Sequence, residues 1–318
     1  MASPALVGDI GGTNSRFALV DEGVEIRDIE KYKNDDFPSL EAAAREYLDR
    51  KGHPKVRALS FAIAGPVTSE PIALTNRDWS FTRASLKEAT GAERAIILND
   101  FEALALSLPH LKAGDLVQIG GHPPPKPEVK IVLGPGTGLG MATLAPLPKG
   151  GWIALPGELG HGTLPIVTRE EFELLEAMTL PGVLFESEDA ITGPGILRMY
   201  NAICELTGER AAQHTPEAVI AAARDDADRA ARRALDQFVI WLARLAGDAA
   251  MILQAHGGVY LAGGIAPTII EELKKGPFRT IFQEKGRLAH VMRPIPIYVI
   301  TDRFPAFKGC AAALARPD

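Results

Sequence analysis

The first apolar run of the chain covers residues 5–10, and a short polar turn separates it from a second apolar run at residues 17–20. Two apolar runs around Gly11-Gly12 predict a β-hairpin, because paired glycines are a strong turn signal. Glycine permits positive φ and lets another group come close to the backbone. Consecutive amide N–H groups in such a turn can bind a phosphate, whereas the simpler interpretation is an ordinary hairpin with a polar tip.

Polar side chains on both sides of this turn favour the phosphate-binding interpretation. Asp9 lies just before the glycines, and Thr13, Asn14 and Arg16 follow them. A carboxylate does not bind a phosphate directly, but it suits the hydrated Mg²⁺ that accompanies one. Thr13 and Asn14 add short donors and Arg16 adds a positive charge, so the turn is predicted to bind a phosphate together with its metal ion.

A second glycine turn repeats this pattern far along the chain. The apolar strand 131–133 leads into residues 134–140 (GPGTGLG), and another apolar segment follows. Two similar hairpins in one chain predict a duplicated fold with a nucleotide bound between its halves.

The spacing of apolar positions predicts further strands and helices. The predicted strands are 56–64, 95–98, a strand from residue 259, and 295–300. The predicted helices are 40–50, 85–90, 170–178, 196–207, 216–224, 227–254 and 306–316, with another directly after Asp100.

Asn99 and Asp100 stand between the apolar strand 95–98 and this helix. The pair therefore lies at the carboxyl end of a strand, where open α/β sheets carry their ligand-binding groups. The alternative is an N-cap that begins the helix. The two interpretations are compatible, because Asn99 can cap the helix while Asp100 points outward.

A carboxylate and an imidazole, Glu158 and His161, stand three positions apart in a loop that contains Gly157, Gly160 and Gly162. The spacing would suit a zinc pair on a helix, but the glycines argue against a helix and no third ligand is near. One acceptor and one group that both donates and accepts suit a polyhydroxyl ligand. The alternative is a structural histidine.

Two further segments carry weaker signals. Residues 186–189 hold three acids, which by themselves indicate a solvated turn.

Gly263-Gly264 follows the strand that begins at residue 259 and precedes a helix. This arrangement allows close backbone approach to an adenine or a ribose, although this segment by itself favours a compact strand–helix turn.

Composition limits the classes of protein that remain. The 318 residues suffice for about two domains. A net charge of −6 gives no electrostatic support for nucleic-acid or anionic-membrane binding, so we expect neither partner. Cys204 and Cys310, the two cysteines, support neither a disulfide framework nor a zinc cluster. No apolar run reaches the length of a membrane span, and we expect a cytoplasmic protein.

The two glycine hairpins resemble the phosphate motifs of the sugar-kinase/Hsp70/actin superfamily. Taken with the other motifs, the chain is similar nearly from end to end to bacterial glucokinases outside the ROK branch, which itself carries a cysteine-rich zinc motif that is absent here. The motifs that carry this resemblance are residues 8–16 (GDIGGTNSR), 99–101 (NDF), 134–140 (GPGTGLG), 156–161 (PGELGH), 193–195 (GPG) and 261–265 (LAGGI).

The resemblance implies an α/β, two-domain, actin-like or ribonuclease H-like ATPase fold with a cleft between a small and a larger domain. The small domain is expected at residues 1–110, completed by the C-terminal helix within 302–318, and the large domain at 111–301. The implied reaction is ATP-dependent phosphorylation of the 6-hydroxyl of D-glucose to glucose 6-phosphate, the entry step of glycolysis. ATP and Mg²⁺ are the implied cofactors, and the family suggests a homodimer.

The resemblance also assigns roles to residues. Asp100 matches the general base, and it contacts the sugar together with Asn99, Glu158, His161 and Glu188. Asp9 is expected to hold Mg²⁺ through water. The expected nucleotide-binding residues are Asp9, Gly11, Gly12, Thr13, Asn14, Thr137, Gly138, Gly263 and Gly264. The family often has a glycine where this chain has Leu159, and we expect the leucine to stiffen the loop.

Two other functions remain open at this point. A kinase for fructose, mannose or an amino sugar would need the same residues. A non-catalytic, actin-like nucleotide switch would need both hairpins and the 261–265 turn, but it would not need Asp100 or the loop with Glu158 and His161.

Overall fold

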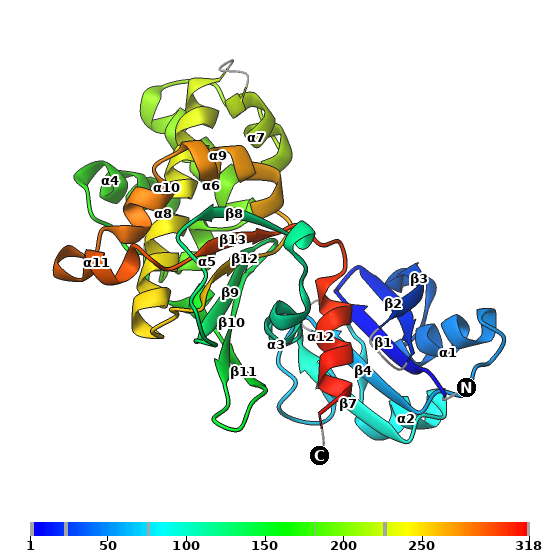
Figure 1. The fold of residues 1–318 in the computed structure, drawn as a ribbon. Helices are drawn as coiled ribbons and strands as arrows, with labels where there is room; N and C mark the ends of the chain where they lie inside the picture. Colours follow the sequence, from blue (N-terminus) through cyan, green and yellow to red (C-terminus); the bar gives the residue numbers. More distant parts are fainter. Residues whose placement is uncertain (1–2, 22–24, 75–76, 181, 225–227, 317–318) are drawn as a thin grey trace. The chain divides into compact units, whose positions relative to one another are not determined.

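The computed structural model describes residues 3–21, 25–74, 77–180, 182–224 and 228–316. Its contacts divide the chain into two compact units (Figure 1). Unit 1 contains Met1–Lys112, Gly151–Pro156 and Asp302–Asp318, and unit 2 contains Ala113–Gly150 and Gly157–Thr301. Residues 1–2, 22–24, 75–76, 181, 225–227 and 317–318 of the expected domains lie outside the described residues, and residue 227 is also the first residue of a predicted helix.

Unit 1 is built on a five-stranded sheet in the order β3-β2-β1-β4-β7. Its strands are β1 (Ala5–Ile10), β2 (Asn14–Val20), β3 (Ile26–Lys33), β4 (Ala58–Ile63) and β7 (Arg94–Asn99), with a separate pair β5 (Ile72–Ala73) and β6 (Ser80–Phe81). Its helices are α1 (Leu40–Arg50), α2 (Arg83–Thr90), α3 (Asp100–Ser107) and α12 (Pro305–Leu314).

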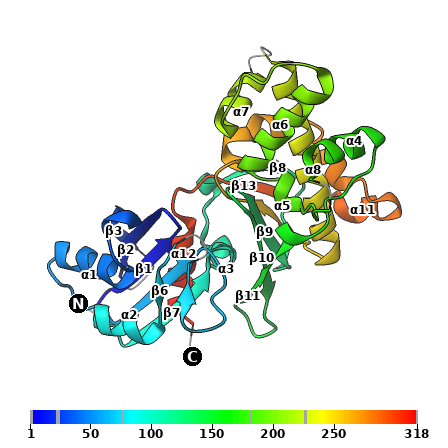
Figure 2. The same ribbon diagram turned by 180° about the vertical axis from the view of Figure 1, so that it is seen from behind.

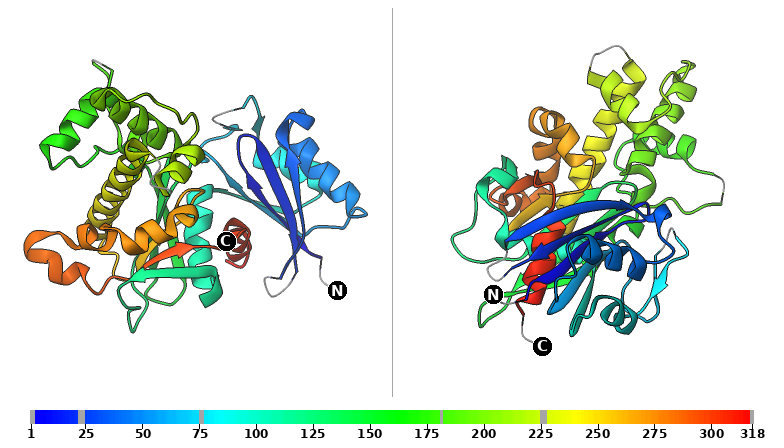
Figure 3. Two further views of the ribbon diagram at one scale, coloured as in Figure 1. Left: turned by 90° about the horizontal axis from the view of Figure 1, so that it is seen from above. Right: turned by 90° about the vertical axis from the view of Figure 1, so that its right-hand side faces the viewer.

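The predicted first hairpin is confirmed. β1 pairs antiparallel with β2 and parallel with β4, and β4 pairs parallel with β7. Alternation along β1 places Leu6 and Ile10 in an apolar core with Tyr47 of α1 and Leu86 of α2. Helices α1 and α2 therefore cover one face of the sheet, and α3 and α12 cover the other (Figure 3).

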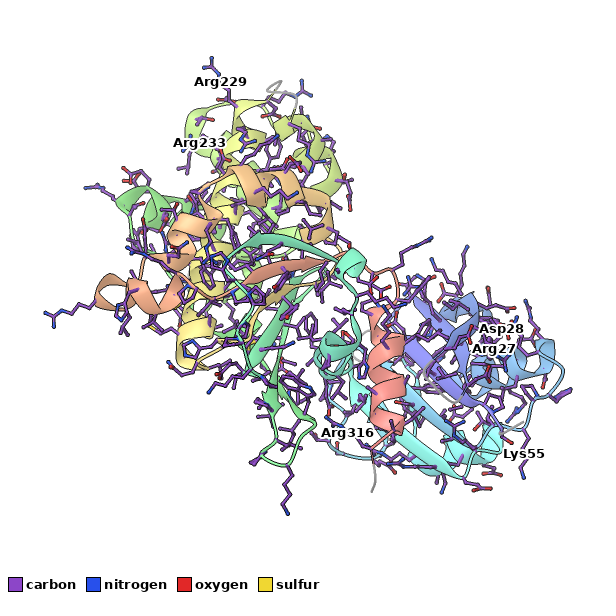
Figure 4. All side chains as sticks on the ribbon, in the orientation of Figure 1. Arg27, Asp28, Lys55, Arg229, Arg233 and Arg316 are labelled. Atoms are coloured by element: carbon purple, nitrogen blue, oxygen red, sulfur yellow. The ribbon has the colours of Figure 1, made fainter. Side chains whose placement is uncertain are left out.

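Helix α12 lies directly against α3, β1 and β4, although it comes from the opposite end of the sequence. The guanidinium of Arg94 on β7 donates to the carbonyl oxygens of Leu314 at 3.2 Å and Arg316 at 3.1 Å. Figure 4 labels Arg316 at this end of the helix. These contacts make α12 an integral part of unit 1.

The second sheet has six strands in the order β11-β10-β9-β12-β13-β8. Five of them belong to unit 2: β8 (Leu116–Gly120), β9 (Lys130–Pro135), β10 (Leu139–Pro146), β12 (Gly258–Leu261) and β13 (Ile297–Ile300). The edge strand β11 (Trp152–Gly157) pairs with β10, although its residues up to Pro156 are grouped with unit 1. The helices of unit 2 are α4 (Arg169–Met178), α5 (Ser187–Ala190), α6 (Gly193–Thr207), α7 (Pro216–Arg224), α8 (Arg229–Ile252), α9 (Ile270–Lys275), α10 (Phe278–Gln283) and α11 (Ala289–Met292).

Helix α8 provides the centre of the unit 2 core. It contacts β9 and β12 and is flanked by α6, α7 and α10 (Figure 2). Phe238, Trp241 and Leu242 on its inner face are completely buried. Among the described helices, α8 included, none combines the length and apolarity that a bilayer crossing requires.

The two sheets repeat one topology, as the two glycine hairpins predicted. In unit 2, β9 pairs antiparallel with β10 and parallel with β12, and β12 pairs parallel with β13. This repeats the arrangement of β1, β2, β4 and β7 in unit 1. Each unit thus contains a hairpin whose first strand runs parallel to the next two strands of its sheet.

The predicted start of one helix lies three residues too late, and other predicted ends differ from the structure by one or two residues. Helix α6 begins at Gly193, whereas the sequence pattern placed its start at Ile196. The Thr192 side chain caps the helix by accepting the amide of Gly195. Pro194 fits the first turn because the amide hydrogen that proline lacks would have no partner within the helix there. The motif at residues 193–195 is therefore the first turn of α6.

The contact between α3 and α12 gives a test of the unit 1 core. A Cβ on Gly309 would lie 1.7 Å from the carbonyl oxygen of Ala103, so Gly309→Ala must separate the two helices. Overpacking of this kind costs about 1–3 kcal/mol in the free energy of unfolding. Urea unfolding of Gly309→Ala measures this loss.

Gly114→Ala is the matched control, because a Cβ on Gly114 has no atom within 4 Å. A surface change of this kind should stay within about 0.5 kcal/mol of the unchanged protein. Equal stability of the two variants would contradict the close packing of α12 on α3.

Candidate functional site

The first hairpin places Asp9 and Arg16 opposite each other on β1 and β2. The Arg16 guanidinium donates to Oδ2 of Asp9 at 2.9 Å, and each side chain is about one-third exposed. Burial raises the pKa of Asp9, and the charge of Arg16 and its hydrogen bond oppose that rise. Asp9 is thus a partly desolvated carboxylate beside the turn, with one oxygen already paired.

The turn of this hairpin does not use the backbone freedom of glycine at Gly11, which adopts no positive φ. A Cβ on Gly11 would meet only the carbonyl oxygen of Asn14, at 3.4 Å, which is ordinary van der Waals contact. Neither backbone conformation nor packing requires glycine at this position, and Thr13 at the tip is exposed.

Parallel pairing brings the turn and Asp100 to the same edge of the unit 1 sheet. Ile10 at the end of β1 is in register with Ile63 of β4, and Ile63 is in register with Asn99 at the end of β7. The hairpin turn and the β7–α3 junction therefore both lie at the carboxyl end of parallel strands. Ligands of open α/β sheets bind at this edge.

Asn99 takes the capping role that the sequence left open at this junction. Oδ1 of Asn99 accepts the amides of Phe101 at 2.9 Å and Glu102 at 3.3 Å, so the predicted cap is confirmed. Its Nδ2 donates to the carbonyl of Gly65 at 3.2 Å. Asp100 is the first residue of α3, and its Oδ1 accepts the amide of Phe101 at 2.9 Å.

The second hairpin has a tight turn between β9 and β10. The amide of Gly136 donates to the carbonyl of Gly138 at 2.8 Å, and Thr137 at the tip is exposed. The amide of Gly193, the first residue of α6, donates to the carbonyl of Gly136 at 2.9 Å. The positive end of the α6 dipole therefore lies beside the turn, an arrangement that favours an anion there.

Glu188 on α5 contacts this hairpin directly. Its Oε2 accepts the amide of Leu139 at 2.7 Å. A Cβ on Gly138 would lie 2.8 Å from the same oxygen, and a Cβ on Gly160 would lie 3.3 Å from it. Glycines at these two positions leave the space that the Glu188 carboxylate occupies between the hairpin and the 159–161 turn.

His161 lies in that turn, η4 (Leu159–His161), and is paired with an acid from another segment. Its Nδ1 lies 2.6 Å from Oε2 of Glu186. This hydrogen bond raises the pKa of His161, with smaller contributions from the charges of Glu188 and Glu158. Glu158 itself is exposed at the start of the turn. Leu159 packs against the unit 2 core, which anchors the turn between Glu158 and His161.

The turn after β12 packs against the second hairpin. Gly263 has a φ of 78°, and a Cβ there would lie 2.5 Å from the carbonyl oxygen of Pro135. The amide of Ile265 donates to that carbonyl at 3.3 Å. A Cβ on Gly264 would meet no atom within 4 Å, so packing does not require glycine there.

The expected site residues thus form two groups, one in each unit. Unit 1 holds the first hairpin turn with Asn99 and Asp100. Unit 2 holds the second hairpin turn, the Gly263-Gly264 turn and the expected sugar ligands Glu158, His161 and Glu188. In the described parts of the chain, no group of three His, Cys, Asp or Glu side chains is arranged to hold a metal ion.

Sequence reasoning missed Glu186, which it treated as part of a solvated acidic turn. Glu186 reaches His161 because Thr163 and Glu186 form an isolated antiparallel bridge. The amide of Ser187 also donates to the carbonyl of Gly162 at 2.9 Å. Contacts between segments this far apart leave no local pattern in the sequence.

Comparison with known proteins gives a consistent result. A family model described as Glucokinase matches residues 6–317. A glucokinase of Chromobacterium violaceum is 39% identical over 315 residues, covering 99% of this chain and 90% of the relative. The crystal structure of a glucokinase from an Antarctic psychrotroph has a TM-score of 0.89 and 31% identity, covering 99% of both chains. A ROK family glucokinase from Streptomyces griseus, in complex with glucose and AMPPNP, has a TM-score of 0.64 and 21% identity, covering 98% of this chain and 99% of its own; it shares the fold.

The pairing of His161 with Glu186 gives a test by titration. Because the pKa of His161 is raised, its ion pair with Glu186 is fully formed at pH values below the ordinary histidine pKa of about 6.5. The ion pair is lost as the pH rises through the raised pKa of His161. Glu186→Gln removes the negative charge but keeps the shape, so the pKa of His161 should fall toward its ordinary value. NMR titration of the His161 ring measures this change.

Glu170→Gln is the matched control, because Glu170 is an exposed acid on α4 and does not contribute to the pKa of His161. Its His161 titration should match that of the unchanged protein. The same His161 titration curve in Glu186→Gln would show that Glu186 does not govern this imidazole.

Proposed function

The chain belongs to the glucokinase family, and we propose that it transfers the γ-phosphoryl group of ATP to the 6-hydroxyl of glucose. The observation that carries this proposal is the shared edge of the unit 1 sheet, where the hairpin turn and Asp100 both follow parallel strands. A turn suited to phosphate and a carboxylate suited to proton transfer are the two groups that this reaction needs.

Phosphoryl transfer passes through a loose transition state, so positioning and charge neutralisation provide most of the catalysis. We assign the phosphates to Gly11, Gly12, Thr13 and Asn14 of the first turn. We also assign phosphate binding to Thr137 and Gly138 of the second turn, where the positive end of α6 adds to the attraction. Gly263 and Gly264 allow the backbone to approach the adenosine.

Asp9 fits the magnesium ion that accompanies ATP. It offers a hard oxygen ligand, and within the described residues no hydrogen bond reaches its Oδ1. Mg²⁺ keeps several waters and is bound in nucleotide sites by one or two carboxylates and the phosphates, so one carboxylate suffices. When bound, the ion neutralises charge on the phosphates. Burial disfavours the charged form of Asp9, and a cation there would offset this cost.

Asp100 is assigned as the general base that accepts the proton of the 6-hydroxyl. Its Oδ1 accepts the Phe101 amide at the start of α3, which holds the carboxylate at the polar edge of the sheet. Asn99 holds the junction in place through its cap and its bond to Gly65. A positioned base of this kind contributes about 10²–10⁴-fold to the rate.

The sugar is assigned to Glu158, His161 and Glu188 together with Asn99 and Asp100. Sugar hydroxyls both donate and accept, so carboxylates beside an imidazole can distinguish their arrangement. Glu186 fixes the imidazole through Nδ1, which directs Nε2 to the ligand. A polar group that sugar binding buries and that a wrong sugar leaves unpaired costs about 1–3 kcal/mol, and this difference is the basis of selectivity.

We also propose a homodimer located in the cytoplasm. Support for the dimer comes from exposed apolar side chains in one segment of unit 2, because such patches mark interaction surfaces. These side chains are Val167, Phe172, Leu180, Val183 and Leu184, each more than half exposed. Sedimentation velocity measures the oligomeric state.

Support for the cytoplasmic location comes from the cysteines. Cys204 and Cys310 are free and buried, which fits a reducing compartment.

The proposed function is tested by a coupled assay for ADP release with ATP, Mg²⁺ and a panel of sugars. We expect turnover with glucose, glucose 6-phosphate as the product, and loss of activity with EDTA. Faster turnover with fructose, mannose or an amino sugar would change the assigned substrate. Absence of sugar-dependent ADP release would overturn the proposal.

Replacement of the base should separate chemistry from binding. Asp100→Asn keeps the size of the side chain but cannot accept the proton, so kcat should fall at least about 100-fold. The dissociation constant for glucose should change by less than about threefold, because the amide can still hydrogen-bond the sugar. Steady-state kinetics and calorimetry measure the two quantities.

The matched control for this variant is Glu88→Gln, an exposed acid on α2 in the same unit. Its kcat should equal that of the unchanged enzyme. Turnover of Asp100→Asn within a few-fold of that value would refute the assignment of the base.

Replacement of a sugar ligand should change a different constant. Glu158→Gln keeps the fold of the exposed turn but removes the charged acceptor, so it should weaken glucose binding at least about tenfold. ADP affinity should change by less than about twofold. Calorimetry with each ligand separates the effects, with Glu170→Gln as the control, and a larger loss for ADP than for glucose would dismiss the assignment.

A further inference from the structure

Asn34 is a completely buried polar residue that neither the motifs nor the proposed mechanism uses. It is the first residue of the turn η1 (Asn34–Asp36), which directly follows β3. Its side chain lies against the turn of the first hairpin, about twenty positions earlier in the chain. A buried amide is retained only when its hydrogen-bonding groups are satisfied, so its contacts define its role.

Every hydrogen-bonding group of Asn34 that faces the hairpin is used. Its Nδ2 donates to the carbonyl of Gly11 at 2.7 Å and to the carbonyl of Gly12 at 3.0 Å. Its backbone amide donates to the carbonyl of Thr13 at 3.0 Å. Its Oδ1 accepts the hydroxyl of Ser15, itself buried, at 2.7 Å. One residue thus holds three successive carbonyl groups of the turn.

These bonds determine where the amides of the turn point. In a trans peptide the C=O of one residue and the N–H of the next point in opposite directions. Because the carbonyls of Gly11 and Gly12 point to Asn34, the amides of Gly12 and Thr13 point away from it. Neither amide has an acceptor in the part of the chain that the structure describes. Adjacent amides without acceptors form the kind of concavity that binds a phosphate oxygen.

We propose that Asn34 is a positioning residue for the nucleotide, and that it holds the first turn so that the amides of Gly12 and Thr13 face a phosphate of ATP. The inference rests on the proposed function, which assigns the phosphates to this turn. It also explains why the turn needs no positive φ at Gly11. The carbonyls are fixed by an outside donor, and glycine leaves the ligand side of the backbone open.

The role needs the chemistry of asparagine. One amide nitrogen has two hydrogens and can span two neighbouring carbonyls, while the oxygen of the same group accepts from Ser15. Alanine removes all three side-chain bonds. The backbone bond to Thr13 remains in any variant, so the turn is loosened without being detached from η1.

The experiment compares Asn34→Ala with the unchanged enzyme by calorimetry with ADP and Mg²⁺ and by steady-state kinetics. Loss of two buried hydrogen bonds to the turn should weaken ADP binding and raise KM for ATP about tenfold. KM for glucose should stay within about twofold, because the assigned sugar ligands do not contact Asn34. A merely structural residue would not separate the two substrates in this way.

Two further variants keep the test decisive. Ser15→Ala leaves the Nδ2 bonds in place and removes the hydroxyl that orients the amide, so it should weaken ADP binding about two- to threefold. Thr90→Ala removes a buried hydrogen bond elsewhere in unit 1, from Thr90 Oγ1 to the carbonyl of Leu86, and should lower the unfolding temperature without changing ADP affinity.

The outcomes distinguish this inference from the proposed function. Unchanged ADP affinity in Asn34→Ala, or equal weakening in Thr90→Ala, overturns the role of Asn34 while glucose turnover by the unchanged enzyme stands. If Asn34→Ala does not fold, unchanged ADP affinity in Ser15→Ala overturns it. If the unchanged protein binds ADP but does not phosphorylate a sugar, the proposed function fails and the ADP measurements still decide the role of Asn34.

Discussion

The in-register parallel pairing of β1, β4 and β7 determines where the polar groups of unit 1 meet. β1 and β4 are buried along most of their length, β7 is partly buried, and the last residues of the three strands are aligned across the sheet. The chain leaves each of these strands at the same edge, so the hairpin turn and the start of α3 are placed there together. A shift of one residue in the pairing would turn the side chains of a strand to the opposite face, so the apolar core and the polar edge depend on the same register.

Both units hold their polar groups by contacts from segments that are distant in the sequence. Asn99 reaches Gly65, Glu188 reaches Leu139, and Glu186 reaches His161. Each contact satisfies a hydrogen-bonding group and fixes the orientation of a side chain or turn. Preorganisation of this kind lowers the entropy lost when a ligand binds, because the groups are ordered before it arrives.

The sequence predicted what local patterns encode. Both hairpins, the cap at Asn99 and most helices follow from the spacing of apolar residues and from the glycines and polar residues that end each segment. The structure confirms them. The contacts of Glu186 with His161 and of Asn34 with the first turn were not predictable, because each joins residues about twenty or more positions apart. The start of α6 was placed too late, since Gly193 and Pro194 lack helix propensity and the cap at Thr192 outweighs it. Gly11 adopts no positive φ, and its carbonyl accepts a hydrogen bond from Asn34 that no local pattern predicts.

The return of α12 to unit 1 has a consequence for the order of folding during synthesis. A ribosome makes the chain from its first residue, so all of unit 2 emerges before residues 305–314 do. Until then, α3 and the neighbouring faces of β1 and β4 lack their cover, including the surface on which Gly309 meets Ala103. Unit 2 can thus complete its apolar core first. During that time unit 1 exposes apolar surface of the kind that nascent-chain chaperones recognise.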